Sequence, residues 1–278
     1  MSRIEDRTAR REGAGQGPPR RLRLLSFNIH AATSTDRFHH YLTHSWRQVL
    51  PHSQRVRNLD EISSLVTGFD MVALQEADTG SLRSGFLNQS RYIATHAGMP
   101  YWVHQSTRKL GNMSFTGNGF LSRFEPLRVE EHRLPGVIPG RGSMLLHFGG
   151  ERGLVVAVVH LALGRRAREL QLDYLAGHLH GAPNLVVMGD FNTEADGGQV
   201  QRFCERLGLR APTAGIASYP AWQPQRSIDH ILVSEALATH DIRALEVAVS
   251  DHCPVALTLE LPVDIDLAPR AALLSAAV

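Results

Sequence analysis

Two polar residues near the middle of the chain, Asp190 and Asn192, have the types and spacing that phosphate chemistry needs. They follow an apolar run, Leu185 to Met188, which predicts a buried strand. Residues two apart in an extended segment share a face, so the carboxylate and the carboxamide can point together from the strand's end. Such a pair suits holding a water molecule and a phosphate. Gly-Asp-x-Asn is also common turn chemistry, so this stretch alone leaves a plain turn as an equal alternative.

The same arrangement recurs along the chain, because polar residues of a few types stand at the ends of several apolar runs. They are Asn28, Glu76, His160, Asp190 with Asn192, Asp229, and Asp251 with His252. Each one alone is more simply explained as a solvated turn or a hydrogen-bonded structural histidine. Several coincident strand ends of the right types change that balance, because loops there can converge while the sheet holds them rigid. The sequence therefore predicts one site built from many segments.

The residue types of this set indicate the chemistry. Carboxylates and amides are hard oxygen donors, and without a thiolate among them they suit Mg²⁺ or Mn²⁺. The histidines supply protonatable donors for phosphate oxygens. The chain lacks a Gly-x-Ser-x-Gly nucleophile, a Walker loop and a Gly-x-Gly-x-x-Gly fingerprint. These features favour metal-assisted attack of water on phosphorus, without a covalent enzyme intermediate.

Apolar runs and helical periodicity predict the elements that carry these residues. We expect strands over Leu22–Phe27, Met71–Leu74, Tyr101–His104, Phe120–Ser122, Met144–Phe148, Leu154–Val159, Leu185–Met188, Ile231–Val233, Leu245–Val249 and Val255–Leu261. We expect helices over Arg55–Val66, Gln89–Ala97, Ala167–Leu179 and Val200–Leu207, and a loop-rich stretch over Pro126–Gly142. Strands and helices mixed in this way are typical of a layered α/β protein.

Length and composition predict one catalytic domain with a tail at each end. The chain has 278 residues, of which 43% are hydrophobic, with no internal repeat or linker. We divide it into a disordered basic tail (1–20), a domain (21–262) and a C-terminal tail (263–278). A nucleic-acid-binding arm is the alternative for the first tail. The net charge is +2, and the arginines of that tail account for much of the excess. The near-neutral body argues against the broad basic face of a dedicated DNA binder.

The cysteines and the apolar runs predict a soluble cytoplasmic protein. Cys204 and Cys253 form neither a disulfide framework nor a zinc-ligand pattern, which favours a reducing compartment. The N-terminus has no apolar core of a secretory signal, and no apolar run is long enough to span a bilayer. His40 and His44 would share a helix face, but no acidic or cysteine partner lies at zinc-site spacing. A substrate-facing insert or ordinary surface is favoured for that segment.

The strand-end motifs also occur in a recognisable order. They are Ser26-Phe-Asn28, Leu74-Gln-Glu76, Gly117-Asn118 with Leu121-Ser-Arg123, Val159-His160, Gly189-Asp-Phe-Asn192, Ser227-Ile-Asp229 and Ser250-Asp-His252. This ordered set resembles the endonuclease/exonuclease/phosphatase superfamily, the DNase-I-like metal-dependent phosphoesterases. Each motif alone is loose, whereas the ordered set is specific and spans the chain from Leu22 to Leu261. The resemblance implies a four-layer α/β sandwich, in which two mixed β-sheets pack face to face with helices outside.

The resemblance also implies roles for the matching residues in metal and water binding. Glu76 resembles the principal metal ligand, with Asn28 beside it and Asp251 completing the Mg²⁺ or Mn²⁺ site. Asp190 would orient or deprotonate the attacking water, and Asn192 would hold the phosphate.

The histidines have implied roles at the phosphate. His252 resembles the phosphate-contacting histidine, oriented by Asp229, a carboxylate that favours the imidazolium form. His160 matches a second histidine of the DNase-I-like and sphingomyelinase-like branches and could protonate the leaving oxygen. Asn118 either contacts substrate or braces the site.

Differences between this chain and particular branches of the superfamily narrow the range of expected substrates. The inositol-polyphosphate phosphatase branch is expected to carry Trp-Cys-Asp-Arg where this chain has Pro224-Gln-Arg-Ser-Ile-Asp229. The apurinic-site endonuclease branch usually lacks a histidine at the position of His160, and the near-neutral body argues against extended duplex contact. Trp222 could stack a base or cover a lipid headgroup, or pack on the sheet. Arg165 could hold a second phosphate or form a solvated helix start.

The sequence therefore predicts a divalent-metal-dependent phosphoesterase. A small or lipid-linked phosphodiester is the favoured substrate. A DNA or RNA nuclease is the alternative, and an inactive binding module on the same scaffold is a third hypothesis. The sequence leaves open the physiological substrate, monoester against diester preference, the number of metal ions and the oligomeric state.

Overall fold

A computed structural model describes most of the predicted domain. It covers residues 20–30, 52–80, 87–110, 114–137, 139–150, 152–263, 265 and 267. The tail before Arg20, the segment with His40 and His44, and most of the tail after residue 262 lie outside these residues.

In the described part of the chain, the strands form two six-stranded mixed sheets. The first has the order β11-β12-β1-β2-β4-β3 and the second β5-β6-β7-β8-β10-β9. The strands are β1 (Arg20–Asn28), β2 (Met71–Asp78), β3 (Tyr101–Leu110), β4 (Ser114–Ser122), β5 (Arg128–Arg133), β6 (Gly142–Phe148), β7 (Leu154–His160), β8 (Asn184–Asp190), β9 (Leu209–Arg210), β10 (Asp229–Ser234), β11 (Ala238–Ala244) and β12 (Val255–Leu261). The pairs β1–β2 and β7–β8 are parallel, and the others are antiparallel.

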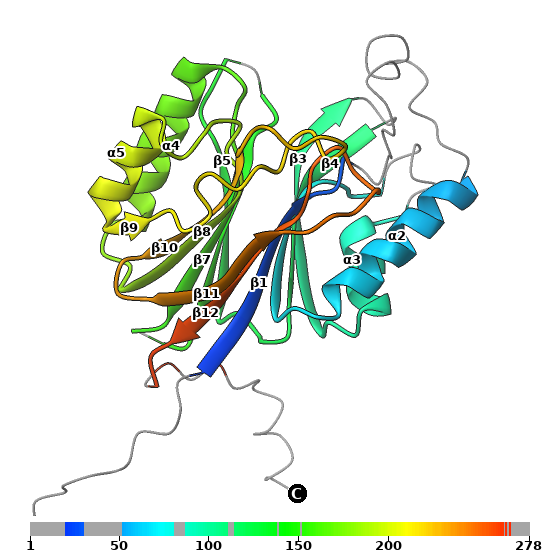
Figure 1. The fold of residues 1–278 in the computed structure, drawn as a ribbon, viewed down its shortest axis with the longest axis horizontal. Coiled ribbons are helices and arrows are strands. Elements are labelled where there is room, and N and C mark those ends of the chain that lie inside the picture. The colour runs from blue at the N-terminus through cyan, green and yellow to red at the C-terminus, as the bar shows by residue number, and fades with distance from the viewer. Residues whose placement is uncertain are drawn as a thin grey trace, which may run out of the picture.

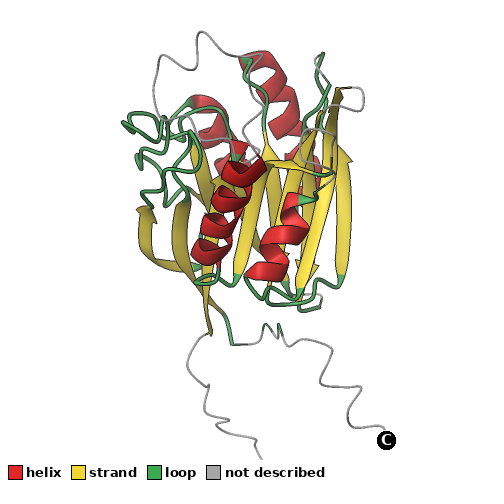
Figure 2. Ribbon diagram, turned by 90° about the vertical axis from the view of Figure 1, so that its right-hand side faces the viewer, coloured by secondary structure: helices red, strands yellow, loops and turns green. Residues whose placement is uncertain are grey.

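Helices cover the outer face of each sheet. They are α2 (His52–Val66), α3 (Gln89–His96), α4 (Arg165–Leu179) and α5 (Gly198–Leu207). Figure 1 shows α2 and α3 outside one sheet and α4 and α5 outside the other, and Figure 2 shows the first helix pair in front of the strands. The predicted four-layer α/β sandwich is confirmed. No helix in the described part of the chain has the length and apolar character to cross a bilayer.

Three separate hydrophobic cores hold the four layers together. Leu24 and Val158 belong to the core between the sheets. Their chain neighbours point the other way: Leu25 packs in the core with α2 and α3, and Val159 in the core with α4 and α5. Because side chains alternate across a strand, a strand buried on both faces has a nearly continuous apolar sequence. This is why the central strands are visible in the sequence.

Three edge strands, β5, β9 and β11, differ from the sequence prediction, which placed no strand at the two-residue β9. β5 lies inside the stretch expected to be loop-rich, and β11 ends at Ala244, whereas we expected a strand over Leu245–Val249. That expectation was wrong. Edge strands have a solvated face and tend to be polar. The sequences Arg-Val-Glu-Glu-His-Arg in β5 and Ala-Thr-His-Asp-Ile-Arg-Ala in β11 are accordingly only partly buried and carry no apolar run.

Candidate active site

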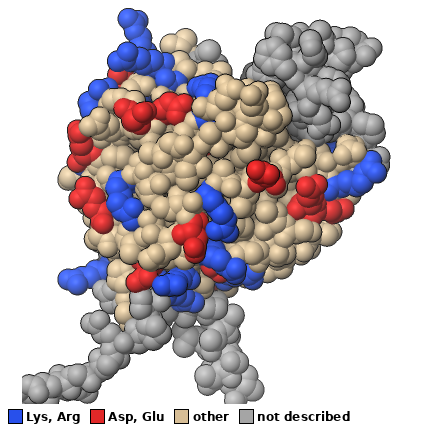
Figure 3. Space-filling model, in the orientation of Figure 1, with Lys and Arg blue, Asp and Glu red and all other residues tan. Residues whose placement is uncertain are grey.

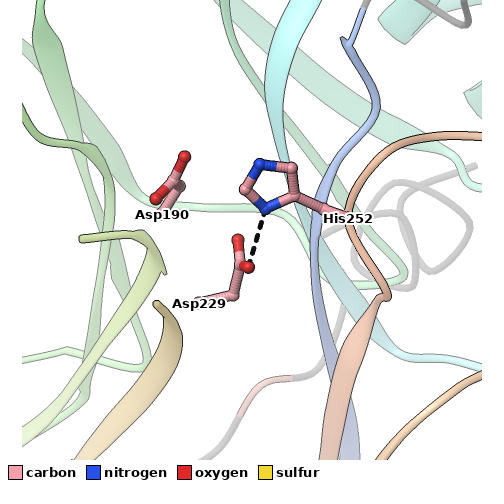
Figure 4. A group of neighbouring side chains, drawn as sticks. All are labelled: Asp190, Asp229 and His252. Carbon is pink, nitrogen blue, oxygen red and sulfur yellow. Dashed lines mark hydrogen bonds and ion pairs between the residues drawn. The ribbon is translucent and has the colours of Figure 1, made fainter. Parts of the chain in front are cut away.

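Predicted site residues from both sheets meet at one end of the molecule. The parallel pairing of β7 with β8 sets His160 beside Asp190, and the antiparallel pairing of β8 with β10 sets Asp190 beside Asp229. From the first sheet, Nδ2 of Asn28 donates a hydrogen bond to Oδ2 of Asp190 at 3.0 Å. Figure 4 shows Asp190, Asp229 and His252 pointing toward one another. The strand ends therefore converge, as the sequence predicts.

Two carboxylates, Glu76 and Asp251, lie close to the same ring nitrogen of His30. Nδ1 of His30 is 3.4 Å from Oε2 of Glu76 and 3.6 Å from Oδ1 of Asp251. Burial tends to raise the pKa of Glu76, but the hydrogen bond with His30 and the charges of nearby histidines lower it far below its usual range. Burial tends to lower the pKa of His30, but Glu76 and Asp251 raise it above its usual value. Glu76 is therefore ionised at neutral pH.

The donors around Glu76 fit a hard divalent cation. Glu76, Asp251 and Asn28 offer oxygen atoms, the ligands that Mg²⁺ and Mn²⁺ prefer. Oδ1 of Asn28 accepts the backbone N–H of His30 at 3.1 Å. This contact orients the Asn28 amide, with its oxygen toward His30 and its nitrogen toward Asp190.

Asp190 occupies a more enclosed position than Glu76 and is almost fully buried. Its Oδ1 accepts the backbone N–H of Asn192 at 2.8 Å, and its Oδ2 lies 3.5 Å from Nε2 of His160. Burial, and then the charge of Asp229, raises the pKa of Asp190 to about 7. A carboxyl group that titrates near neutral pH is suited to accept a proton from water.

His252 forms a buried ion pair with Asp229. Its Nδ1 lies 2.8 Å from Oδ2 of Asp229, and the Ser218 hydroxyl donates to the same oxygen at 2.6 Å. Burial tends to lower the pKa of His252, but the charge and hydrogen bond of Asp229 raise it to about 10. The ligand atoms of Asp190, Asp229 and His252 lie within 4.8 Å of one another. In its protonated form, with Nδ1 held by Asp229, the His252 ring presents Nε2–H as a hydrogen-bond donor that suits an anion.

His160 lies between the two carboxylates Glu76 and Asp190 and contacts an arginine. Its Nε2 is 3.8 Å from Oε1 of Glu76 and in close contact with Nη1 of Arg141. Burial, and then the charge of Arg141, lowers the pKa of His160 to about 3. The imidazole is therefore neutral at pH 7 and carries no extra proton to donate. Protonation of the leaving oxygen by His160 stays a prediction.

The backbone is strained at three residues of the site. His30, Glu76 and Asn192 have φ values of 41°, 56° and 54°, in the left-handed region that residues with a Cβ rarely adopt. Asp241 is the fourth such non-glycine residue in the described part of the chain. Residues held in this region cost on the order of 1–3 kcal/mol each and concentrate at functional sites. At Glu76 the strain accompanies a register shift in the pairing of β2 with β4.

Three predicted substrate-binding residues, Asn192, Asn118 and Trp222, lie beside the converging groups, and Nδ2 of Asn192 donates to the backbone oxygen of Leu161 at 2.9 Å. Asn118 is buried and donates from Nδ2 to the backbone oxygen of Gly142 at 2.9 Å and to Oε1 of Gln105 at 3.3 Å. It thereby ties β4 to β6 across the two sheets. These contacts agree with the alternative in which Asn118 braces the site. Trp222 is partly exposed, in a loop whose Ala221 N–H donates to Asp251 O at 2.8 Å.

Arg165, the remaining predicted substrate-binding residue, stands at the start of α4. Its side chain is 77% exposed, with Nε 4.0 Å from Oε1 of Glu169. The next residue, Arg166, lines the pocket described below, whereas Arg165 does not.

Sequence reasoning missed several residues that complete the site. His30 stands two positions after Asn28, at the same strand end, so its position was available as a signal. Ser218 and Arg141 lie in loop-rich stretches, where nothing in the local pattern marks them. Gln105 also donates from Nε2 to the backbone oxygens of His132 and Ser143, each at 3.1 Å, and so joins the sheets beside Asn118.

A pocket of about 710 Å³ opens from these groups toward α4. Glu76, Arg141 and His160 line its inner part. Its outer part is lined by Val137, Leu163, Gly164, Arg166, Ala167 and Leu170, among other residues. The volume falls in the range of small-molecule sites.

The charge distribution offers no extended basic surface on the face seen in Figure 3. Lys and Arg side chains gather at the upper left and below the centre of this face, in both places beside Asp and Glu, and uncharged surface lies between these groups. A protein that follows a nucleic-acid backbone over several phosphates usually presents a continuous basic stripe. This face has none among the described residues.

Comparisons with known proteins agree with this geometry. A model described as the Endonuclease/Exonuclease/phosphatase family matches residues 25–252. No curated protein matches the chain.

Solved structures share the fold at low sequence identity. An endonuclease/exonuclease/phosphatase from Beutenbergia cavernae DSM 12333 has a TM-score of 0.66 and 20% identity, over 87% of this chain and 72% of that one. A mannosyl-6-phosphatase from Bacteroides thetaiotaomicron VPI-5482 has a TM-score of 0.62 and 17% identity, over 86% and 99%. The human Nocturnin catalytic domain with bound sulfate has a TM-score of 0.63 and 17% identity, over 87% and 95%.

Proposed function

The chain belongs to the endonuclease/exonuclease/phosphatase family, and from that membership we propose that it is a divalent-metal-dependent phosphoesterase. The proposed reaction is hydrolysis of a phosphodiester by direct attack of water on phosphorus. A small-molecule or lipid-linked diester is favoured over nucleic acid. The observation that carries the proposal is the meeting of Asp190, which titrates near neutral pH, with the protonated His252 in one buried cluster.

Glu76, Asp251 and Asn28 would hold Mg²⁺ or Mn²⁺. Bound there, the cation would polarise a phosphoryl oxygen and stabilise the charge that develops on it. The ionised Glu76 and its neighbour Asp251 provide the negative charge that attracts it.

The chain's own groups carry out the proton and charge steps. Asp190 accepts a proton from the attacking water, and the Asn28 amide fixes the orientation of its carboxylate. His252, protonated and held by Asp229, donates a hydrogen bond from Nε2 to a phosphoryl oxygen. Asn192 and Arg141 would contact the phosphate, and His160 with Arg141 would face the leaving group. The leaving oxygen departs as an alcohol with a proton from solvent, and Asp190 returns the proton of the attacking water to solvent.

Two alternative functions, a nuclease and a phosphomonoesterase, each have an observation in their favour. A nuclease agrees with the family, but the mixed charge of the visible face disfavours extended contact with a duplex. The mannosyl-6-phosphatase neighbour acts, by its name, on a monoester, so a monoester substrate is a second candidate. An inactive binding module is disfavoured, because a module without catalysis needs neither Asp190 nor the pair of His252 with Asp229.

The test compares hydrolysis of bis(p-nitrophenyl) phosphate and p-nitrophenyl phosphate with Mg²⁺, with Mn²⁺ and with EDTA. We expect metal-dependent activity, greater on the diester, and its loss in Asp190→Ala and in His252→Ala. Circular dichroism checks that both variants remain folded. Full activity in either folded variant would discard the mechanism, and plasmid nicking exceeding diester hydrolysis at equal enzyme would favour the nuclease.

A further inference from the structure

Exposed apolar side chains gather at the mouth of the pocket that opens from the active site. Val137 is 99% exposed, Leu163 77% and Leu170 56%. All three line the pocket whose inner wall contains Glu76 and His160. They come from two segments, the loop after β5 and the stretch that runs from the β7–α4 loop into α4, which the fold brings to the same place. We call these three residues the apolar rim.

Of the other large exposed apolar residues in the described part of the chain, Trp222 stands in the loop beside Asp251, and Leu127 and Val263 lie at the far end of the sheets. Leu127 precedes β5, and the register of β5 with β6 and of β6 with β7 puts it at the end opposite His160. Val263 follows β12, whose last residue, Leu261, pairs with Arg20 at the start of β1. A single exposed leucine is ordinary, but three at the mouth of a catalytic pocket form a patch of the kind that marks a binding surface.

The apolar rim stands beside cationic groups. The exposed Arg166 lines the same outer part of the pocket, and Arg141 lies deeper, against His160. Apolar side chains that protrude next to arginines are the combination that peripheral proteins use at anionic lipid surfaces.

We infer that the apolar rim docks on a membrane surface and that the substrate is a phospholipid of that surface. A ligand enclosed in the pocket would leave Val137 in water, so only a surface brought to the protein covers the rim. That surface must also deliver a phosphoester to Glu76 and His160, and a phospholipid bilayer offers apolar chains for the rim and anionic phosphoesters for the arginines together. The inference rests on the proposed function for the chemistry, although docking itself is measured separately.

The first experiment compares two soluble chromogenic diesters, p-nitrophenyl methyl phosphate and p-nitrophenyl dodecyl phosphate, below the micellar concentration of the second. The variant replaces the rim: Val137→Ser/Leu163→Ser/Leu170→Ser. We expect the wild-type protein to favour the dodecyl ester at least about tenfold in kcat/KM, and the variant to lose that preference. The kcat/KM of the variant for the methyl ester should stay within about twofold of the wild-type value, which shows that the variant is folded. Leu127→Ser is the matched control and keeps the preference.

The second experiment measures cosedimentation with vesicles of phosphatidylcholine and phosphatidylglycerol, without any turnover. The wild-type protein and Leu127→Ser should pellet with the vesicles, and the rim variant should remain in the supernatant. Equal pelleting of all three proteins overturns the inference.

The two experiments separate the possible failures. Chain-length preference without vesicle binding would indicate a soluble amphiphile and overturn the membrane assignment. A rim variant that changes the oligomeric state in analytical ultracentrifugation, with its ester preference intact, would indicate a second copy on the rim and also overturn it. If no ester is hydrolysed, the proposed function fails, while vesicle binding still decides the docking.

Discussion

Glu76 and Asp190 lie within reach of the same histidine, yet their surroundings move their pKa values in opposite directions. Glu76 is a third exposed and sits beside His30, which holds its pKa far below the usual range. Asp190 is buried beside a second carboxylate, Asp229, and its pKa rises to about 7. Two identical functional groups thus acquire different properties from their neighbours alone.

The difference divides the site into two halves. A carboxylate that stays ionised attracts a cation, whereas one that titrates near pH 7 exchanges protons with water. The Glu76 half, with His30 and Asp251, is therefore suited to hold the metal. The Asp190 half, with Asp229 and His252, is suited to move a proton and to bind the phosphate.

The strongest test of this division replaces each carboxylate by its amide. Asp190→Asn should lower kcat by about 10²–10⁴ and leave metal binding nearly unchanged, because only the proton acceptor is lost. Glu76→Gln should weaken binding of Mn²⁺ by about 10–100-fold, because a charged ligand becomes neutral. Calorimetric titration with Mn²⁺ and single-turnover kinetics separate the two effects. If Asp190→Asn loses Mn²⁺ binding as completely as Glu76→Gln, both carboxylates bind the metal and the proposed division of the site is wrong.

A second prediction concerns Asp229, which keeps His252 charged. In metal-free wild-type protein, the His252 ring should titrate near pH 10, and Asp229→Asn should lower that pKa by about 1–3 units. Because the folded pKa exceeds the ordinary 6.5, the pair stabilises the protein fully below pH 6.5 and loses that contribution as the pH rises to about 10.

NMR of the His252 ring in EDTA measures this directly, with His96 as an exposed reference ring. Activity of Asp229→Asn should fall with the loss of the imidazolium. A His252 pKa that is the same in both proteins would show that Asp229 does not keep His252 protonated.

The smallest expected effect comes from Gly189, which positions only the Asp190 half. Its φ is 153°, and a Cβ at this residue would lie 1.9 Å from the backbone oxygen of Val159. Gly189→Ala should therefore push β8 from β7, lower the free energy of unfolding by about 1–3 kcal/mol and reduce kcat. Mn²⁺ binding should remain. Urea unfolding, with Gly177→Ala as a control at a helical glycine with open space around it, measures the loss.

The sequence predicted those features that have a local signature. Strands buried on both faces are continuous apolar runs, so β7 and β8 and the polar residues at their ends were visible. The stacking of the layers was implied only by the ordered motifs, since periodicity does not say which sheet a strand joins. Edge strands β5 and β11 escaped notice because half their side chains face water.

The contacts that set the chemistry were beyond local pattern. Arg141 contacts His160 because β6 and β7 are paired, and no property of its own segment indicates that contact. The opposite pKa shifts of Glu76 and Asp190 likewise depend on which side chains the fold places beside each one.

The polar ties between the sheets have a consequence for how the protein becomes active. Asn28 reaches from β1 to Asp190, and Gln105 and Asn118 reach from the first sheet to the backbone of β5 and β6. None of these bonds can form in a chain whose two halves have folded separately. We therefore expect the proposed activity to require both sheets, because Asn28 and Asp190 reach their positions only when the two sheets are packed together.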